Sequence, residues 1–224
     1  MKALLFDLDD TLYAESDFVT SGFYAVARHP GVRPRIAHRR AFELMTGVFA
    51  SKGRRRVLPA LRKRLLDPTL SLQELVRAYR EHSPRIRLLP GYGTLLRGLR
   101  RHYSLGLITD GLPAVQRRKV AALGLEALFD RIIYTWEHGR EREKPNPYAF
   151  HLMLRELDVK AAEVLYVGDN ARKDGVGAHR AGIAFVHVRS FVDATVPHTG
   201  LGGRASPFHV ESLHQLPDLL ASLG

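Results

Sequence analysis

The sequence has 224 residues and contains no cysteine, a single tryptophan and three methionines. The absence of cysteine excludes disulfide bonds, thiolate metal ligands and cysteine nucleophiles. No apolar run is long enough to span a bilayer. The short run after Lys2 ends in aspartates, whereas a signal peptide would end in a small-residue cleavage site. We therefore expect a cytoplasmic protein that does not contact a membrane.

Acidic residues are scarce relative to basic ones, with 23 Asp and Glu against 34 Lys and Arg, which gives a net charge of +11. Such an excess favours an anionic ligand or a nucleic-acid surface. The basic residues are not arranged as a stripe interleaved with stacking aromatics, and no standard nucleic-acid-binding module is present. We expect a small anionic substrate and no nucleic-acid partner. The sequence does not indicate an oligomeric state.

Short apolar runs alternate with helix-like segments along much of the chain, which is typical of a parallel sheet covered on both faces. The runs are continuously apolar, as in strands buried on both sides. The fold class that we predict is α/β, with a Rossmann-like doubly wound parallel sheet. The predicted strands are residues 3–9, 104–111, 130–137, 163–170 and 184–190, and the helix-like segments between them are 114–125, 146–159 and 173–183.

Residues 14–89 break this alternation, because they contain no convincing strand. Their apolar residues recur at helical spacing, and turns with proline or glycine separate the segments. We predict a catalytic core formed by residues 1–13 and 90–224, and a small helical domain at 14–89 inserted after the first strand. The predicted helices of this insert are 21–30, 37–51, 56–66 and 70–83.

Chemically active residues follow the predicted strands where each one ends. In open α/β sheets the ligand site lies at the carboxyl ends of the strands, so these residues are expected to meet on one edge. They are Asp7 and Asp9 after the first run, Thr109, Asp110 and Gly111 after the second, Lys144 in the loop after the third, and Asp169 and Asp174 after the fourth.

Carboxylates that are packed together repel one another and need a counter-ion. Hard oxygen ligands suit Mg²⁺, which is commonly held by one or two carboxylates, waters and a substrate phosphate. A carboxylate that faces a phosphate can attack phosphorus. A second carboxyl group can protonate the leaving oxygen and later deprotonate water. A hydroxyl, backbone amides and a lysine can hold the phosphoryl oxygens.

Four motifs, "DLDDT", "ITDG", "KPNP" and "GDNARKD", occur in this order between Asp7 and Asp174. In order, spacing and predicted strand context they resemble the haloacid dehalogenase-like hydrolase superfamily. The resemblance implies that Asp7 is the nucleophile, that it becomes an aspartyl-phosphate and that its carboxylate also belongs to the Mg²⁺ site. It implies that Asp9 is the general acid/base, with its main-chain carbonyl on Mg²⁺. Asp169 is implied as a direct Mg²⁺ ligand, and Asp174 as a residue that supports the metal through water.

The same resemblance implies the residues that bind the phosphoryl group. Thr109 and Lys144 would bind it through their side chains, and Lys144 would also moderate the charge on Asp7. Asp110 and Gly111 would contribute through their backbone. Thr11 is expected to have a structural role in the loop after the first strand.

The helical insert also has a counterpart in one large subgroup of this superfamily, where a cap domain follows the first motif and helps to select the substrate. The haloacid dehalogenases proper lack an acid at the position of Asp9, so its presence favours phosphoryl chemistry. The implied function is a Mg²⁺-dependent phosphatase that acts on a small phosphorylated metabolite.

Other readings remain open at this point. A sugar-phosphate phosphomutase of the same superfamily would return the phosphoryl group to its substrate. A phospho-receiver domain uses a similar set of residues, but its phosphorylated aspartate lies deeper in the chain. The run Arg54–Arg56 would suit a nucleic-acid-binding protein, although a solvated helix start explains it as well.

Several other residues receive structural interpretations. Asp10 is interpreted as a loop or capping residue, in contrast to its acidic neighbours. His187 is interpreted as a packed residue of a strand. Tyr13, Phe18 and Phe23 are interpreted as core residues rather than as the lining of a pocket.

Overall fold

The computed structural model describes residues 1–67, 69–191 and 208–223. The long loop that the sequence predicts over residues 191–210 lies for the most part outside this range. The chain folds into two compact units, one formed by Met1–Ala14 with Arg87–Gly224 and the other by Glu15–Ile86. The first boundary lies one residue and the second three residues away from the predicted ones at 13 and 89.

The first unit contains a parallel sheet with the strand order β3-β2-β1-β4-β5-β6. Five of its strands lie within the five predicted runs. The sixth, β6, was predicted as part of a loop, which is wrong, because its three residues pair with β5. The strands are β1 Ala3–Phe6, β2 Ser104–Thr109, β3 Arg131–Tyr134, β4 Val164–Gly168, β5 Ala184–Val188 and β6 Phe208–Val210.

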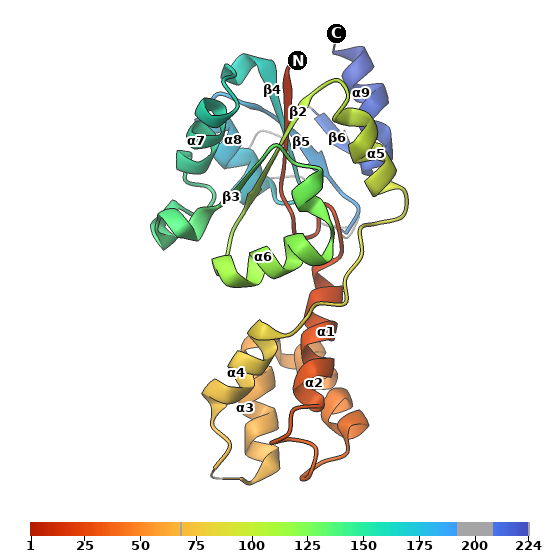
Figure 1. Cartoon of the computed structure of the whole chain (residues 1–224), viewed down its shortest axis with the longest axis vertical. Coiled ribbons are helices and arrows are strands. Elements are labelled where there is room, and N and C mark those ends of the chain that lie inside the picture. Colours follow the sequence, from red (N-terminus) through yellow and green to blue (C-terminus); the bar gives the residue numbers. More distant parts are fainter. Residues whose placement is uncertain (68, 192–207, 224) are drawn as a thin grey trace. The chain divides into compact units, whose positions relative to one another are not determined.

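Helices cover both sides of the sheet, with α7 and α8 on one side and α5 and α9 on the other (Figure 1). No helix in the described residues has the length and apolar character that crossing a membrane requires. The helices of this unit are α5 Tyr92–Leu99, α6 Pro113–Ala122, α7 Tyr148–Glu156, α8 Val176–Arg180 and α9 Leu216–Ser222, with a π-helical segment, Ala171–Gly175, before α8.

Alternate residues of the strands build the core on the side of α7 and α8. On this side Leu5 of β1 and Tyr166 of β4 pack with Phe150 and Met153 of α7. Gly177 of α8 lies so close to Phe150 that a Cβ atom would approach the ring to 2.5 Å. The glycine therefore permits close packing of α8 against α7 on this side of the sheet.

The second unit is helical and has a core of its own, formed by residues such as Phe23, Met45, Leu61 and Leu75. Its last helix begins with a capping box, in which the side chains of Ser71 and Glu74 each bond the backbone N–H of the other. The helices are α1 Glu15–Ala27, α2 His38–Lys52, α3 Arg54–Leu65 and α4 Leu72–Glu81. This unit corresponds to the predicted helical insert, and its role as a cap stays a prediction.

Candidate active site

Parallel register brings the predicted site residues to the carboxyl edge of the sheet. Phe6 of β1 pairs with Leu107 of β2 and with Val167 of β4. The backbone N–H of Asp7 continues this ladder and donates to the carbonyl of Val167 at 2.9 Å. Asp7, Thr109 and Asp169 therefore stand where three neighbouring strands end, as the α/β rule predicts.

Lys144 connects the residues at this edge. Its side chain is only 3% exposed, and its ammonium donates to Asp7 Oδ1 at 2.5 Å. It also lies 2.7 Å from Asp174 Oδ1 and donates to the hydroxyl of Tyr166 at 3.1 Å. One buried ammonium thus contacts two carboxylates that are 167 residues apart in the sequence but lie at the same edge of the sheet.

The charges around Asp7 are not balanced. Burial raises the pKa of the Asp7 carboxyl well above its ordinary value, and the neighbouring carboxylates of Asp174 and Asp169 raise it further against the attraction of Lys144. Burial alone would lower the pKa of Lys144, but Asp174 and Asp7 together raise it well above its ordinary value. The cluster therefore keeps its ammonium and has more acid than this cation can neutralise.

Asp169 is held by contacts from both sides. Its backbone N–H donates to the Thr11 hydroxyl at 3.1 Å, and its carbonyl oxygen lies 2.7 Å from Nε2 of His187. Burial and the charge of Asp174 raise the pKa of the Asp169 carboxyl to about 7. Thr11 thus has the structural role that was expected, and His187 has a contact with the site that the sequence did not suggest.

Asp174 is the most deeply buried acid of the cluster, with 1% of its side chain exposed. Its Oδ1 accepts from Tyr166 at 3.1 Å in addition to Lys144, and its Oδ2 accepts from the backbone N–H of Asn170 at 3.0 Å. A Cβ atom on Gly168 would stand 2.5 Å from Asp174 Oδ2. A glycine at the end of β4 is therefore needed for Asp174 to approach the strand.

Asp7, Asp169 and Asp174 form a group that could hold a metal ion. Each offers a carboxylate oxygen, and the three oxygens lie within 4.8 Å of one another. Carboxylate oxygens are hard donors of the type that Mg²⁺ selects. The excess of negative charge in the cluster is what a divalent cation would neutralise, so the donor set fits the predicted metal.

The second strand provides the predicted phosphate-binding residues. Thr109 is fully buried, and its hydroxyl accepts a hydrogen bond of 2.5 Å from Gln116. Asp110 uses its side chain within the protein, because its Oδ1 accepts from the hydroxyl of Thr135 at 2.8 Å and from the backbone N–H of Lys144 at 3.1 Å. Gly111 has a φ of 120°, a conformation that side chains disfavour.

Asp9 lies in a separate group of contacts. The ammonium of Lys119 donates to its Oδ1 at 2.7 Å and to its Oδ2 at 3.0 Å. Gln116 donates to Oδ2 at 3.0 Å, and the hydroxyl of Tyr13 makes a short hydrogen bond to Oδ1. Burial alone would raise the pKa of the Asp9 carboxyl, but the charge and hydrogen bonds of Lys119, together with the hydrogen bonds from Tyr13 and Gln116, bring the net pKa below its ordinary value.

The sequence interpretation missed Lys119, Gln116 and Tyr166. Gln116 and Lys119 are three positions apart on α6, and both are buried, at 2% and 4% exposure. Polar residues on the inner face of a predicted helix are a signal that could have identified them. Tyr166 offers no such signal, because an aromatic residue inside an apolar strand is usually core. Tyr13 is fully buried, as expected, but its hydroxyl also reaches Asp9.

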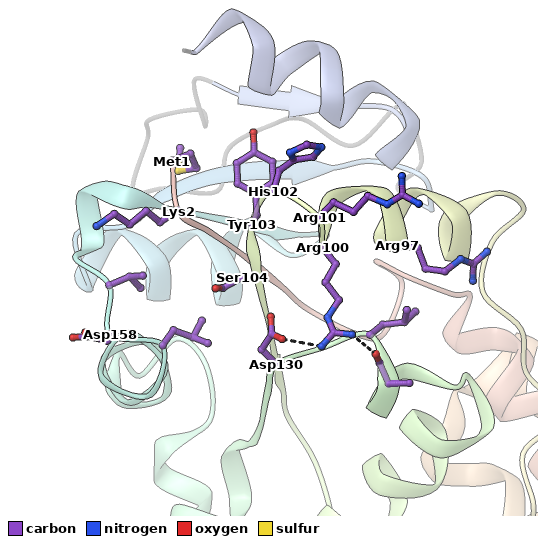
Figure 2. A pocket seen from close by; sticks show the side chains of 14 residues that line it. Met1, Lys2, Arg97, Arg100, Arg101, His102, Tyr103, Ser104, Asp130 and Asp158 are labelled. Atoms are coloured by element: carbon purple, nitrogen blue, oxygen red, sulfur yellow. Dashed lines mark hydrogen bonds and ion pairs between the residues drawn. The ribbon is translucent and has the colours of Figure 1, made fainter.

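A wide hollow of about 1170 Å³ lies at the opposite ends of the strands, around Lys2 and Ser104 (Figure 2). Arg100, one of the basic residues that line it, donates to Asp130 at 3.0 Å and to the carbonyl of Ala127 at 2.8 Å. Lys2 is paired with a glutamate at 2.9 Å. The hollow contains none of the predicted site residues and is not the candidate active site.

Comparisons with known proteins show similarity over most of the chain. A model of haloacid dehalogenase-like hydrolases matches residues 4–188. Glyceraldehyde 3-phosphate phosphatase of Methanopyrus kandleri is 32% identical over 200 residues, 84% of each chain. The enzyme of the same name from Methanocaldococcus jannaschii is 29% identical over 100% of this chain and 98% of that one. The crystal structure of a 2-haloacid dehalogenase from Pseudomonas syringae superposes with a TM-score of 0.68 over the whole of both chains, at 24% identity, which supports the fold.

Proposed function

The chain belongs to the haloacid dehalogenase-like hydrolases, and on that premise we propose that it is a Mg²⁺-dependent phosphatase of a small phosphorylated metabolite. The observation that carries the proposal is the grouping of Asp7, Asp169 and Asp174 around the ammonium of Lys144. This arrangement combines a nucleophile, a candidate metal site and a cation for phosphoryl oxygens at one edge of the sheet.

Asp7 and Asp169 would bind Mg²⁺ directly, and the carbonyl of Asp9 would complete the protein's contribution. Asp174 would act through water, because both of its oxygens already accept hydrogen bonds from Lys144, Tyr166 and Asn170. When bound, Mg²⁺ would neutralise charge between the carboxylates and the phosphoryl group.

Asp7 would attack phosphorus through a carboxylate oxygen, and the bond from phosphorus to the leaving oxygen would break. Asp9 would first take up a proton in place of one of its hydrogen-bond donors and would then give it to that leaving oxygen, so the alcohol departs neutral. A water molecule would then attack phosphorus in the aspartyl-phosphate and lose its proton to Asp9. Inorganic phosphate leaves, and both aspartates return to their starting forms.

The remaining residues would hold the phosphoryl oxygens. The Thr109 hydroxyl accepts from Gln116 and still has its own O–H to donate. The backbone N–H groups of Asp110 and Gly111 are further donors at the end of β2. Lys144 contacts Asp7 at 2.5 Å, which would place its charge beside a phosphoryl group attached to that aspartate. These donors would stabilise charge in the transition state.

The names of the relatives support the proposed substrate class. Two of them are named glyceraldehyde 3-phosphate phosphatase and are similar to this chain over most of its length, and a phosphoserine phosphatase of Thermus thermophilus matches about half of it. Small phosphomonoesters such as glyceraldehyde 3-phosphate are therefore the first candidates. The helical unit Glu15–Ile86, which carries most of the excess positive charge of the chain, would serve as the cap that selects among such anions.

The test is a phosphate-release assay with purified protein, with and without Mg²⁺. The panel contains glyceraldehyde 3-phosphate, phosphoserine, hexose phosphates, nucleoside monophosphates and 4-nitrophenyl phosphate. We expect release from at least one alkyl phosphate, and we expect EDTA to abolish it. An isomerised sugar phosphate without release of phosphate would favour the phosphomutase alternative. Turnover that is unaffected by EDTA would contradict the proposed metal requirement.

A further inference from the structure

The carboxylate of Asp9 is fully occupied by hydrogen bonds. Oδ1 accepts from Tyr13 and Lys119, and Oδ2 accepts from Gln116 and Lys119. An ionised carboxylate has about four lone-pair sites, so no acceptor position is left over. A proton that Asp9 takes up or passes on must replace one of these contacts.

Lys119 lies deeper in the protein than Asp9. Its side chain is 4% exposed, whereas that of Asp9 is 24% exposed. An incoming molecule therefore meets Asp9 before it could meet the ammonium. Because Lys119 bonds both carboxylate oxygens, at 2.7 and 3.0 Å, it fixes the plane of the carboxylate as well as its position.

Gln116 extends this support to a second residue of the site. Its Nε2 donates to Asp9 Oδ2 at 3.0 Å and to the Thr109 hydroxyl at 2.5 Å, which uses both of its N–H bonds. Gln116 and Lys119 are three positions apart on α6 and so project from the same face of the helix. One helix face thus orients the carboxyl group of Asp9 and the hydroxyl of Thr109 together.

We propose that Lys119, assisted by Gln116, is a positioning residue that holds Asp9 in the orientation needed for proton transfer to the leaving oxygen. The inference rests on the proposed phosphatase activity and adds to it a residue pair that acts through Asp9. Lys119 does not touch the substrate, so its substitution should impair only the steps in which Asp9 handles a proton.

The experiment compares two phosphate esters with different leaving groups, measured as kcat/KM at saturating Mg²⁺. An alkyl phosphate found active in the panel needs a proton on its leaving oxygen, whereas 4-nitrophenolate leaves without one. For Lys119→Met we expect kcat/KM to fall about 100-fold for the alkyl ester and less than about 5-fold for 4-nitrophenyl phosphate. Lys119→Arg, which keeps the charge, should retain about a tenth or more of the wild-type kcat/KM for the alkyl ester.

A double-mutant cycle with Asp9→Asn gives the second readout. If Lys119 acts through Asp9, adding Lys119→Met to Asp9→Asn should lower kcat/KM for the alkyl ester by less than about 2-fold further. The carboxyl group that Lys119 would position is already absent in the Asp9→Asn variant. Arg118→Met is the matched control on the same helix. Arg118 bonds the carbonyl of Ala114, and its substitution should leave both rates unchanged.

Equal losses on the two esters, or losses that add in the double mutant, would overturn the proposal and leave Lys119 with a structural role. If Lys119→Met does not fold, Gln116→Leu tests the assisting contact through the ratio of the two kcat/KM values, because the contact with Thr109 that it also removes should affect both esters alike. A wild-type protein that hydrolyses no phosphate ester would instead overturn the proposed function itself.

Discussion

Two aspartates at the end of β1 each contact a buried lysine, but the pKa values of the two aspartates are shifted in opposite directions. Asp7 shares Lys144 with Asp174, while Asp169 adds a third carboxylate nearby. Asp9 faces Lys119 together with two neutral donors, the side chains of Gln116 and Tyr13. The pKa of Asp7 is raised by burial and by its acidic neighbours, whereas the pKa of Asp9 is lowered, against burial, by Lys119, Tyr13 and Gln116 together.

The difference shows that a buried ion pair has no fixed effect on the charge of its acid. What matters is how many acids and donors share the cation. The Asp7 group has an excess of acid, which suits a site that binds a divalent cation. The Asp9 group is saturated with donors, which suits a residue that must keep one orientation. The predictions below test each pair in turn.

Asp7→Asn breaks the first pair at the proposed nucleophile and should have the largest effect. The amide cannot attack phosphorus, so we expect kcat to fall by at least about 10⁴-fold. Circular dichroism and thermal unfolding should show that the fold is kept. The measurement is phosphate release with the substrate identified in the panel.

Asp10→Asn is the matched control for this substitution. Asp10 has a φ of 54°, and asparagine is one of the few residues that tolerate this left-handed conformation. We expect its kcat to stay within about 3-fold of wild type, because Asp10 has no proposed role in the chemistry. Similar losses in the two variants, or retained turnover in Asp7→Asn, would show that the nucleophile assignment is wrong.

Lys144→Met removes the shared cation and leaves Asp7 and Asp174 without their common partner. Breaking a buried ion pair at one end costs about 3–5 kcal/mol of folding free energy, and we expect a loss of this order near neutral pH. Urea unfolding without Mg²⁺ measures it. Added Mg²⁺ should recover part of the loss, since a divalent cation can neutralise the same carboxylates. A loss below about 1 kcal/mol would mean that the cluster does not depend on Lys144.

Asp169, which lies beside the Asp7 pair, and Asp9 should contribute to stability with opposite dependence on pH. The pKa of Asp169 is raised from 3.8 to about 7 in the folded protein. Its contribution to stability is therefore present below pH 3.8 and is lost as the pH rises to about 7. Asp9 has a lowered pKa, so its contribution is present above pH 3.8 and is lost as the pH falls below that value.

As the pH rises from 3.8 to about 7, the free energy of unfolding of the metal-free protein should fall. The loss should be up to about 1.4 kcal/mol per pH unit for each carboxyl group whose pKa is raised. Urea midpoints measured across this range give the slope. Asp169→Asn should flatten it, and saturating Mg²⁺ should do the same because the ion competes with protons for the carboxylates. Stability that increases with pH over this range would contradict the raised pKa values.

Tyr166→Phe is the most conservative way to perturb the Asp7 group. It removes the hydroxyl that contacts Lys144 and Asp174 and keeps the ring packed on Phe150 and Phe185. We expect a stability loss of about 1 kcal/mol, typical of one hydrogen bond, and a fall in kcat of less than about 10-fold. Tyr148→Phe removes a hydroxyl outside the cluster and serves as the control. A stability loss equal to that of Lys144→Met would mean that the cluster depends on the tyrosine hydroxyl as much as on the ammonium of Lys144.

Much of the fold could be predicted because its signals are local. Continuous apolar runs located β1 to β5, and helical periodicity located the insert. The short strand β6 could not be predicted in this way, since three residues carry too little pattern and its pairing with β5 comes from a distant part of the chain. The position of the candidate site followed from one rule, that chemically active residues gather where parallel strands end.

The interactions within the site could not be predicted with the same detail. The sequence indicated Lys144 through its motif, but the contact of its ammonium with Asp174 depends on how the loop after β3 folds over β4. Gln116 and Lys119 lie outside the four motifs. Their contacts with Asp9 arise only because the fold places α6 against the end of β1.

By itself, the sequence determined which residues can do chemistry and at which end of the sheet they lie, because both follow from local patterns and from the direction of the strands. The tertiary structure decided how charge is shared among them. Coulombic interactions and hydrogen bonds act over a few ångströms in space, whatever the separation in sequence. Only the folded chain therefore distinguishes Asp7, which shares its lysine with another acid, from Asp9, which is held by three donors.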